Sequence, residues 1–221
     1  MEIWQLNAGQ WIIAGGPIMW PIIFCSIFAF GIVIERIFYF STIKTDVQYL
    51  KTKLFDLIKG NEIKRAIELC EKNRSPVAKI FQAGIARFGS SREEIKEAME
   101  NVSLFEIPNL ERHLAALATM AHILPLLGLL GTVAGMTSSF YSIQVRSSTL
   151  NPATPGDLAG GIWQALLTTV ASLIVAIPVL AAYNYCVAQV NQFVSQMERA
   201  AAELLNFLCR LTETDTSQHA N

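Results

Sequence analysis

The sequence LPLLGLLGTVAGM at residues 124–136 lies within a longer stretch, residues 113–145, that carries no formal charge. Two further stretches without a formal charge occupy residues 3–34 and 158–197. Each is longer than the roughly 20 residues that an α-helix needs to cross the hydrocarbon core of a bilayer. We therefore predict an all-α, polytopic membrane protein with three transmembrane helices, at about residues 17–40, 118–140 and 162–186.

The overall composition is typical of a membrane protein. Apolar residues make up 52% of the chain and charged residues only 16%, whereas soluble domains usually carry about 25% charged residues. A net charge of -1 gives no basic surface for phosphate, so we expect no nucleic-acid partner. The four cysteines lie far apart in the sequence, which favours reduced thiols and predicts neither a metal site nor a cofactor.

The distribution of basic residues predicts the orientation in the membrane. Arg36 and Lys44 flank the first span, while no Lys or Arg precedes it. By the positive-inside rule, the N-terminal segment (1–16) and the loop between the second and third spans (141–161) lie outside. The insert between the first and second spans (41–117) and the C-terminal helix and tail (187–221) then lie in the cytoplasm.

The insert is expected to be helical. Apolar residues at helical spacing predict helices that start near Val47, near Asn61 as a cap, and at Ser75 and Ser91. We expect the last of these to continue through Pro108, with a kink there, as one rod into the second span.

The second span has one face of small and partly polar residues. On a helix that advances 100° per residue, six residues fall within an arc of about 100°: Gly128, Gly131, Thr132, Gly135, Ser139 and Ser142. Small residues let neighbouring helices approach closely, so we expect the glycines to serve helix packing. Thr132 either bonds back to its own helix or acts on this contact face.

The third span also has a polar face, formed by Gln164, Thr168, Thr169 and Ser172 over an arc of about 140°. Polar groups inside a bilayer face protein or water, so the two faces could line a path or seat another helix. Three helices are too few to enclose a path, which would therefore require a ring of copies. The hydrophobic parts of the spans lack Asp, Glu, Lys and Arg, so the chain has no obvious proton carrier of its own.

Other residues in and near the spans have simpler interpretations. Pro125 and Pro178 are expected to be helix entry or kink points. Glu35 and Arg36 favour interface anchors whose charged ends reach water. His122 is expected to be hydrogen-bonded within the packing, with a proton relay as the alternative. The sequence has no phosphate-binding loop or catalytic motif, so we do not expect an enzyme.

Six short motifs are spread over nearly the whole chain: LPLLGLLGTVAGM at 124–136, GIWQALLTT at 161–169, AIP at 176–178, ER at 35–36, LERHL at 110–114 and AYN at 182–184. Together they resemble the MotA/TolQ/ExbB proton-channel family. With three predicted spans rather than four, the layout is similar to the ExbB and TolQ branch.

The resemblance implies a homo-pentamer in the bacterial inner membrane, with the N-terminus in the periplasm and the C-terminus in the cytoplasm. Its pore would hold a dimeric, single-span partner similar to ExbD or TolR, whose helix carries a proton-accepting Asp. Proton flow would drive mechanical work in the periplasm through a TonB-like or TolA-like protein. TonB-dependent uptake, a Tol-type constriction motor and a non-conducting scaffold all remain open.

The resemblance also assigns roles to residues. Thr132 and Thr169 match the threonines that line the pore in the family. Gln164 stands where relatives commonly have Glu, and an amide cannot accept a proton. Ser172 stands where the family usually has Gly, which implies tighter or more polar packing.

Overall fold

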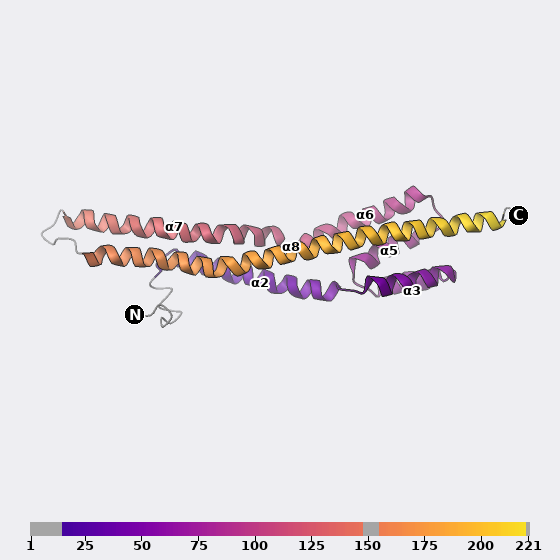
Figure 1. The fold of residues 1–221 in the computed structure, drawn as a ribbon, viewed down its shortest axis with the longest axis horizontal. Coiled ribbons are helices and arrows are strands. Elements are labelled where there is room, and N and C mark those ends of the chain that lie inside the picture. Colours follow the sequence, from indigo (N-terminus) through magenta and orange to yellow (C-terminus); the bar gives the residue numbers. More distant parts are fainter. Residues whose placement is uncertain (1–14, 148–154, 220–221) are drawn as a thin grey trace. The chain divides into compact units, whose positions relative to one another are not determined.

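The protein is built from α-helices in the computed structural model, which describes residues 15–147 and 155–219. No strand occurs in those two ranges, so the predicted all-α class is confirmed. The termini and the centre of the predicted loop between the second and third spans lie outside the described residues. The helices are α2 (Met19–Ile43), α3 (Val47–Lys59), α4 (Ile63–Glu71), α5 (Pro76–Ala86), α6 (Arg92–Glu111), α7 (Leu114–Ser147) and α8 (Pro155–His219) (Figure 1).

Among the described residues, three helical segments are long and apolar enough to cross a membrane: Met19–Lys59, Arg92–Arg146 and Leu158–Thr212. The chain divides into two compact units. Unit 1 comprises Met1–Glu35 and His113–Tyr185, and unit 2 comprises Arg36–Arg112 and Cys186–Asn221.

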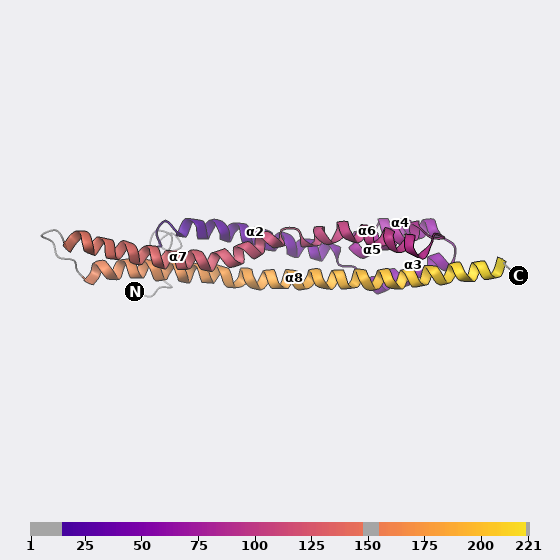
Figure 2. The same ribbon diagram turned by 90° about the horizontal axis from the view of Figure 1, so that it is seen from above.

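Unit 1 is a packed set of three apolar helices, in which α7 runs beside α8 in both views (Figures 1 and 2). Its outward surface is apolar as well, since Phe24, Ile27 and Ile177 are 71%, 70% and 66% exposed. Such a surface suits lipid or other transmembrane helices. The buried core of the unit is Met19, Ile22, Ala29, Ile32, Leu117, Ala121, Leu124, Ala176 and Val179.

Unit 2 contains short helices whose starts are set by local capping. The Asp46 carboxylate accepts hydrogen bonds from the backbone N–H groups at the start of α3, and the Ser75 and Ser91 hydroxyls do so for α5 and α6. The predicted starts at Val47, Ser75 and Ser91 are therefore confirmed.

The predicted cap of α4 is wrong. Asn61 adopts a left-handed conformation, with φ of 57°, and its backbone N–H donates to the Ile58 carbonyl oxygen at 3.0 Å. Asn61 therefore belongs to the end of α3, and Glu62 is the N-cap residue of α4, although its carboxylate makes no capping hydrogen bond to the backbone.

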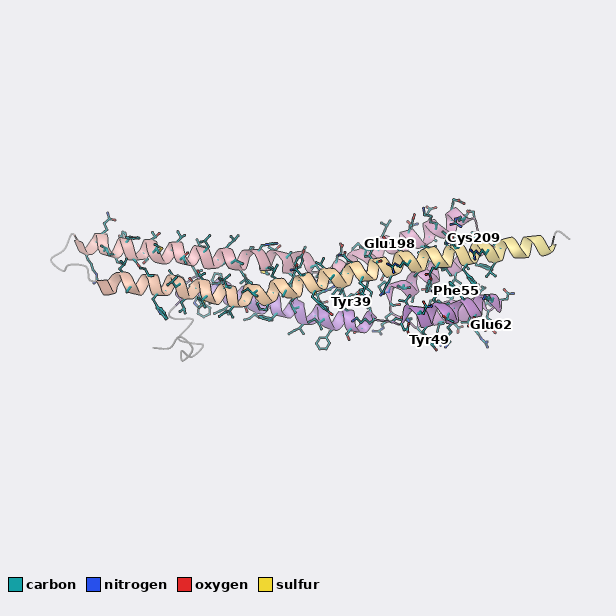
Figure 3. All side chains as sticks on the ribbon, in the orientation of Figure 1. Tyr39, Tyr49, Phe55, Glu62, Glu198 and Cys209 are labelled. Carbon is teal, nitrogen blue, oxygen red and sulfur yellow. The ribbon has the colours of Figure 1, made fainter. Side chains whose placement is uncertain are left out.

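Side-chain contacts join α3 to α8 and α5 to α6 within unit 2. The Phe55 ring of α3, labelled in Figure 3, stacks on the Phe207 ring of α8, with centroids 4.1 Å apart and planes 4° apart. Glu106 of α6 is buried and accepts two hydrogen bonds from the Lys79 ammonium of α5, at 2.8 and 2.9 Å. Aromatic stacking and this paired charge fix α3 and α6 against their neighbours.

The predicted helix through Pro108 is confirmed, but its unbroken continuation into the second span is wrong. Pro108 lies inside α6, which continues to Glu111. The helix then ends at Arg112, whose ψ is 137°, and His113 takes a left-handed φ of 64° before α7 begins. A left-handed residue cannot continue a right-handed helix, so the break falls at His113 rather than at the proline.

Arg36 lies where the end of α6 needs hydrogen-bond donors. In an uninterrupted helix, the Asn109 and Leu110 carbonyls would accept from backbone N–H groups four residues ahead. Here the Arg36 guanidinium approaches both carbonyl oxygens at 3.4 Å and lies 4.9 Å from the Tyr39 ring centroid. Arg36 is only 2% exposed, so the expectation that its charged end reaches water is wrong.

Candidate functional site

The α7 and α8 helices pack tightly along the glycines of α7. A Cβ added to Gly128 would lie 3.2 Å from Thr169 Cα, and one added to Gly135 would lie 2.9 Å from Ala165 Cβ. One added to Gly131 would lie 2.8 Å from Thr168 Cβ. These distances leave no room for a side chain. We call this contact the small-residue seam, formed by Gly128, Gly131 and Gly135 of α7 and by Ala165, Thr168, Thr169 and Ser172 of α8.

Two of the four polar residues predicted on α8 are buried within the seam. Thr168 is 1% exposed and donates its hydroxyl proton to the Ala165 carbonyl oxygen at 2.7 Å. Ser172 is 0% exposed and donates to the Thr169 carbonyl oxygen at 2.9 Å. Both hydroxyl groups therefore satisfy their donors within α8, facing the glycines of α7.

The Thr132 and Thr169 hydroxyls bond to two consecutive backbone carbonyls of α7. The Thr169 hydroxyl donates to the Gly128 carbonyl oxygen across the seam, at 2.9 Å. In a regular α-helix the same carbonyl accepts from the backbone N–H of residue 132. The Thr132 hydroxyl donates to the Leu129 carbonyl oxygen at 2.7 Å. Both threonines are half-buried, so neither residue is fully enclosed within the chain.

The donor protons of both threonines are used, and this decides what they can bind. A hydroxyl group offers one proton and two acceptor lone pairs. With the proton directed at a carbonyl, only the oxygen lone pairs remain for a further partner. The pair therefore suits a hydrogen-bond donor, such as water or a protonated carboxylic acid.

Gln164 lies apart from the two threonines, against the chain that leads into α2. Gly16 has a φ of +69°, and a Cβ added there would lie 3.1 Å from Gln164 Cδ. Gln164 is half-buried, so its amide belongs to the packing around Gly16 as well as to the polar face of α8.

Ser139 lies farther along the glycine face of α7. Its hydroxyl donates to the Gly135 carbonyl oxygen at 3.1 Å.

The remaining predicted residues take different places. Pro125 and Pro178 lie inside α7 and α8. His122 is exposed on the surface of α7 rather than enclosed in packing. Within residues 15–147 and 155–219, no group of three His, Cys, Asp or Glu side chains could hold a metal ion.

One contact was not foreseen from the sequence. His113 Nδ1 lies 3.3 Å from the Glu35 Oε2 of α2, next to an apolar hollow of about 410 Å³ between α2 and the start of α7. The two residues are far apart in the sequence, and only the left-handed turn at His113 brings the imidazole to α2. The LERHL motif was the one sequence signal at this position.

The profile of the MotA/TolQ/ExbB proton channel family matches residues 72–199, which include all of α7 and the whole seam. The chain belongs to this family. The resemblance predicted from the motifs is therefore confirmed.

Named relatives place the chain in the ExbB/TolQ branch of the family. It is 33% identical over 167 residues to a putative biopolymer transport protein ExbB-like 3 of Synechocystis, covering 76% of this chain and 79% of that protein. It is 30% identical over 187 residues to a putative ExbB homolog of Methanothermobacter thermautotrophicus, covering 84% and 64%. It is also 32% identical over 151 residues to the Tol-Pal system protein TolQ of Pseudomonas aeruginosa, covering 63% and 64%.

Proposed function

We propose that this chain is the ring-forming subunit of a motor in the bacterial inner membrane. Five copies surround a dimer of an ExbD-like or TolR-like partner, and proton flow through the ring does mechanical work in the periplasm. The work powers TonB-dependent uptake or related biopolymer transport. Membership in a proton channel family and the names of the ExbB relatives support this proposal.

The observation that carries the proposal is that the Thr169 and Thr132 hydroxyls bond to the consecutive Gly128 and Leu129 carbonyl oxygens of α7, in spans whose apolar parts hold no carboxylate. A proton path needs a group that gains and loses a proton. Since α7 and α8 offer only hydroxyl and amide groups along this face, a partner chain supplies the titrating carboxylate, on a single span that carries an Asp.

The acceptor lone pairs of the two threonines give the ring a defined role. A protonated Asp can donate its hydroxyl proton to Thr132 Oγ1 or Thr169 Oγ1, whereas an ionised Asp finds no free proton there. The pair therefore favours the neutral form of the partner, which can move through an apolar environment. Water at either end of the path then exchanges the proton.

Gln164 has no proton-carrying role in this proposal. Its amide can hydrogen-bond water but cannot take up a proton. Proton transfer therefore depends on the partner Asp alone, and the chain catalyses no chemical reaction.

The proposed orientation follows the positive-inside rule. The N-terminal segment (1–16) and the loop at 141–161 lie in the periplasm, and the insert at 41–117 and the C-terminal part at 187–221 lie in the cytoplasm. Spans at 17–40, 118–140 and 162–186 cross the inner membrane.

Proton flux into vesicles tests the pore assignment. The chain and its partner are co-expressed and reconstituted, and gradient-driven flux is measured for Thr132→Val combined with Thr169→Val. We expect flux to fall about tenfold, because two hydrogen-bond acceptors are lost. Thr119→Val is the matched control, since Thr119 also bonds back to its own helix, to the Ala115 carbonyl, but is exposed outside the seam. Unchanged flux in the double variant would sink the pore assignment and favour a non-conducting scaffold.

A Tol-type motor for envelope constriction is the second candidate, favoured by the 32% identity to TolQ. Purification of the native complex separates the two candidates. A TonB-like protein bound to the complex supports uptake, and a TolA-like protein supports constriction.

A further inference from the structure

Unit 2 has a groove between α8 and the segment that leads into α3. Two adjoining hollows of about 320 and 450 Å³ share Thr45, Asp46 and Gln196, so they form one continuous groove. We call it the α3–α8 groove. Its walls come from unit 2 alone.

A row of amide side chains lines one wall of the groove. Gln189, Gln192 and Gln196 follow one another on α8 at spacings of three and four residues, and Gln48 of α3 lies on the other wall. Each amide offers both a donor and an acceptor. Such a row matches the alternating N–H and C=O groups of an extended peptide.

The length of the groove sets the length of that peptide. From Gln189 to Glu203 the α8 wall extends about 21 Å, at 1.5 Å per residue. An extended chain rises about 3.3 Å per residue, so the groove accommodates about six residues.

The acidic groups of the groove are already engaged. The Asp46 carboxylate accepts from the backbone N–H groups of Gln48 and Tyr49, both at 3.1 Å. The Glu203 carboxylate pairs with the Lys51 ammonium at 2.7 Å. Neither carboxylate is therefore available to pair with a basic ligand.

Two cations remain at the groove. Lys44 and Arg199 have no ion-pair partner among the residues that the structure describes, and both are exposed. Together with Asp46, Lys51 and Glu203 they are all the charged groups that line it. The groove therefore has a surplus of positive charge and favours an acidic segment.

We propose that the α3–α8 groove binds an extended, acidic segment at the cytoplasmic end of the single-span partner. This inference rests on the proposed function. The groove begins at Lys44, directly after the last residue of α2, which is Ile43. It therefore starts just beyond the cytoplasmic end of the first apolar span. The cytoplasmic end of a single-span partner leaves the membrane on the same side.

Site-specific photo-crosslinking tests the proposal with the full chain and its co-expressed partner in membranes. Benzoylphenylalanine replaces Gln192 in the groove or, as a control, the exposed Glu97 of α6. We expect crosslinks from position 192 to the cytoplasmic end of the partner and none from position 97, with the crosslinked peptide identified by mass spectrometry.

Charge reversal supplies the second measurement. Lys44→Glu with Arg199→Glu should lower the crosslink yield about fivefold, the upper end of the effect of losing one exposed ion pair. Changing the acidic residues of the partner segment to Lys should restore the yield. Lys96→Glu, an exposed charge of α6 away from the groove, should leave the yield unchanged.

The outcomes separate this inference from the proposed function. Crosslinks from position 192 to a second copy of this chain or to lipid, or no crosslink at all, would overturn the groove assignment if the partner still co-purifies and flux persists. Failure of any single-span partner to co-purify would instead overturn the proposed function.

Discussion

Thr169 of α8 donates its hydroxyl proton to the Gly128 carbonyl oxygen of α7 across 2.9 Å. This is a side-chain hydrogen bond across the small-residue seam. The Thr168 and Ser172 hydroxyls beside it bond within α8. One side chain therefore ties two apolar helices together at the point where the proposed path runs.

Replacing Thr169 should separate the contribution of its hydroxyl group from that of its branched shape. Thr169→Val keeps the branched shape but loses the hydroxyl, so we expect the free energy of unfolding in detergent to fall by about 0.6–1.7 kcal/mol, as for other hydrogen bonds between membrane helices. Thr169→Ser retains the donor and should lose less. Equal losses for both variants would show that the hydrogen bond contributes nothing.

Enlarging a seam glycine should force α7 and α8 apart. A Cβ on Gly135 would lie 2.9 Å from Ala165 Cβ and 3.0 Å from the Gly161 carbonyl oxygen. We expect Gly135→Ala to lower the free energy of unfolding by about 1–3 kcal/mol, the usual range for overpacking, as measured by thermal unfolding in detergent.

Gly31→Ala is the matched control for the seam glycines. Gly31 lies in α2, and a Cβ there would meet no atom within 4 Å. We expect this variant to be neutral or more stable by up to about 1 kcal/mol, because alanine favours the helix over glycine. A destabilised Gly31→Ala with a stable Gly135→Ala would contradict the seam.

Removing the Arg36 guanidinium should loosen the end of α6. Arg36→Met leaves the Asn109 and Leu110 carbonyls without their charged donor, and hydrogen bonds to charged groups contribute about 1.5–3 kcal/mol. We expect a loss of that order, with faster amide hydrogen exchange in the last turn of α6. Arg87→Met, at an exposed arginine, should change neither quantity.

The left-handed conformation at His113 gives a paired prediction. Asn tolerates a φ of 64°, whereas a β-branched residue does not. Both His113→Asn and His113→Ile remove the imidazole next to Glu35, but only the second adds backbone strain. We expect His113→Ile to be less stable than His113→Asn by about 1–2 kcal/mol in thermal unfolding. Equal stabilities would mean that the helix break tolerates other conformations.

Burial predicts a pH dependence for Cys70. Desolvation, with a smaller contribution from Glu71, raises the pKa of this thiol from 9.0 to about 12. The folded state holds the proton more tightly than the unfolded state, so this contribution to stability is complete below about pH 9 and is lost between about pH 9 and pH 12. Iodoacetamide at pH 8 should therefore label Cys70 more slowly than the partly exposed Cys209, as measured by peptide mass spectrometry. Faster labelling of Cys70 would contradict its burial.

Much of the fold could be predicted because its signals are local. Long apolar stretches identify the membrane-spanning helices, and Asp46, Ser75 and Ser91 cap helices within three residues of themselves. The break at His113 has no local signal, since neither Gly nor Pro is present there. Its stabilising donor, Arg36, is 73 residues away from Asn109.

The candidate site was predictable only in part. Helical geometry places the glycines and Thr132 on one face of α7, and the four polar residues on one face of α8. It does not give the rotation of α8 against α7. That rotation buries Thr168 and Ser172 and leaves Thr169 half-exposed, so the distinction required the structure.

The contact between Gly128 and Ser172 constrains how this protein can evolve. A Cβ added to Gly128 would lie 3.0 Å from Ser172 Cβ, so the two positions share one small volume. An alanine at position 128 is compatible with the fold only if residue 172 shrinks to glycine. Homologous sequences should therefore covary at these positions, with the sum of the two side-chain sizes conserved rather than either residue alone.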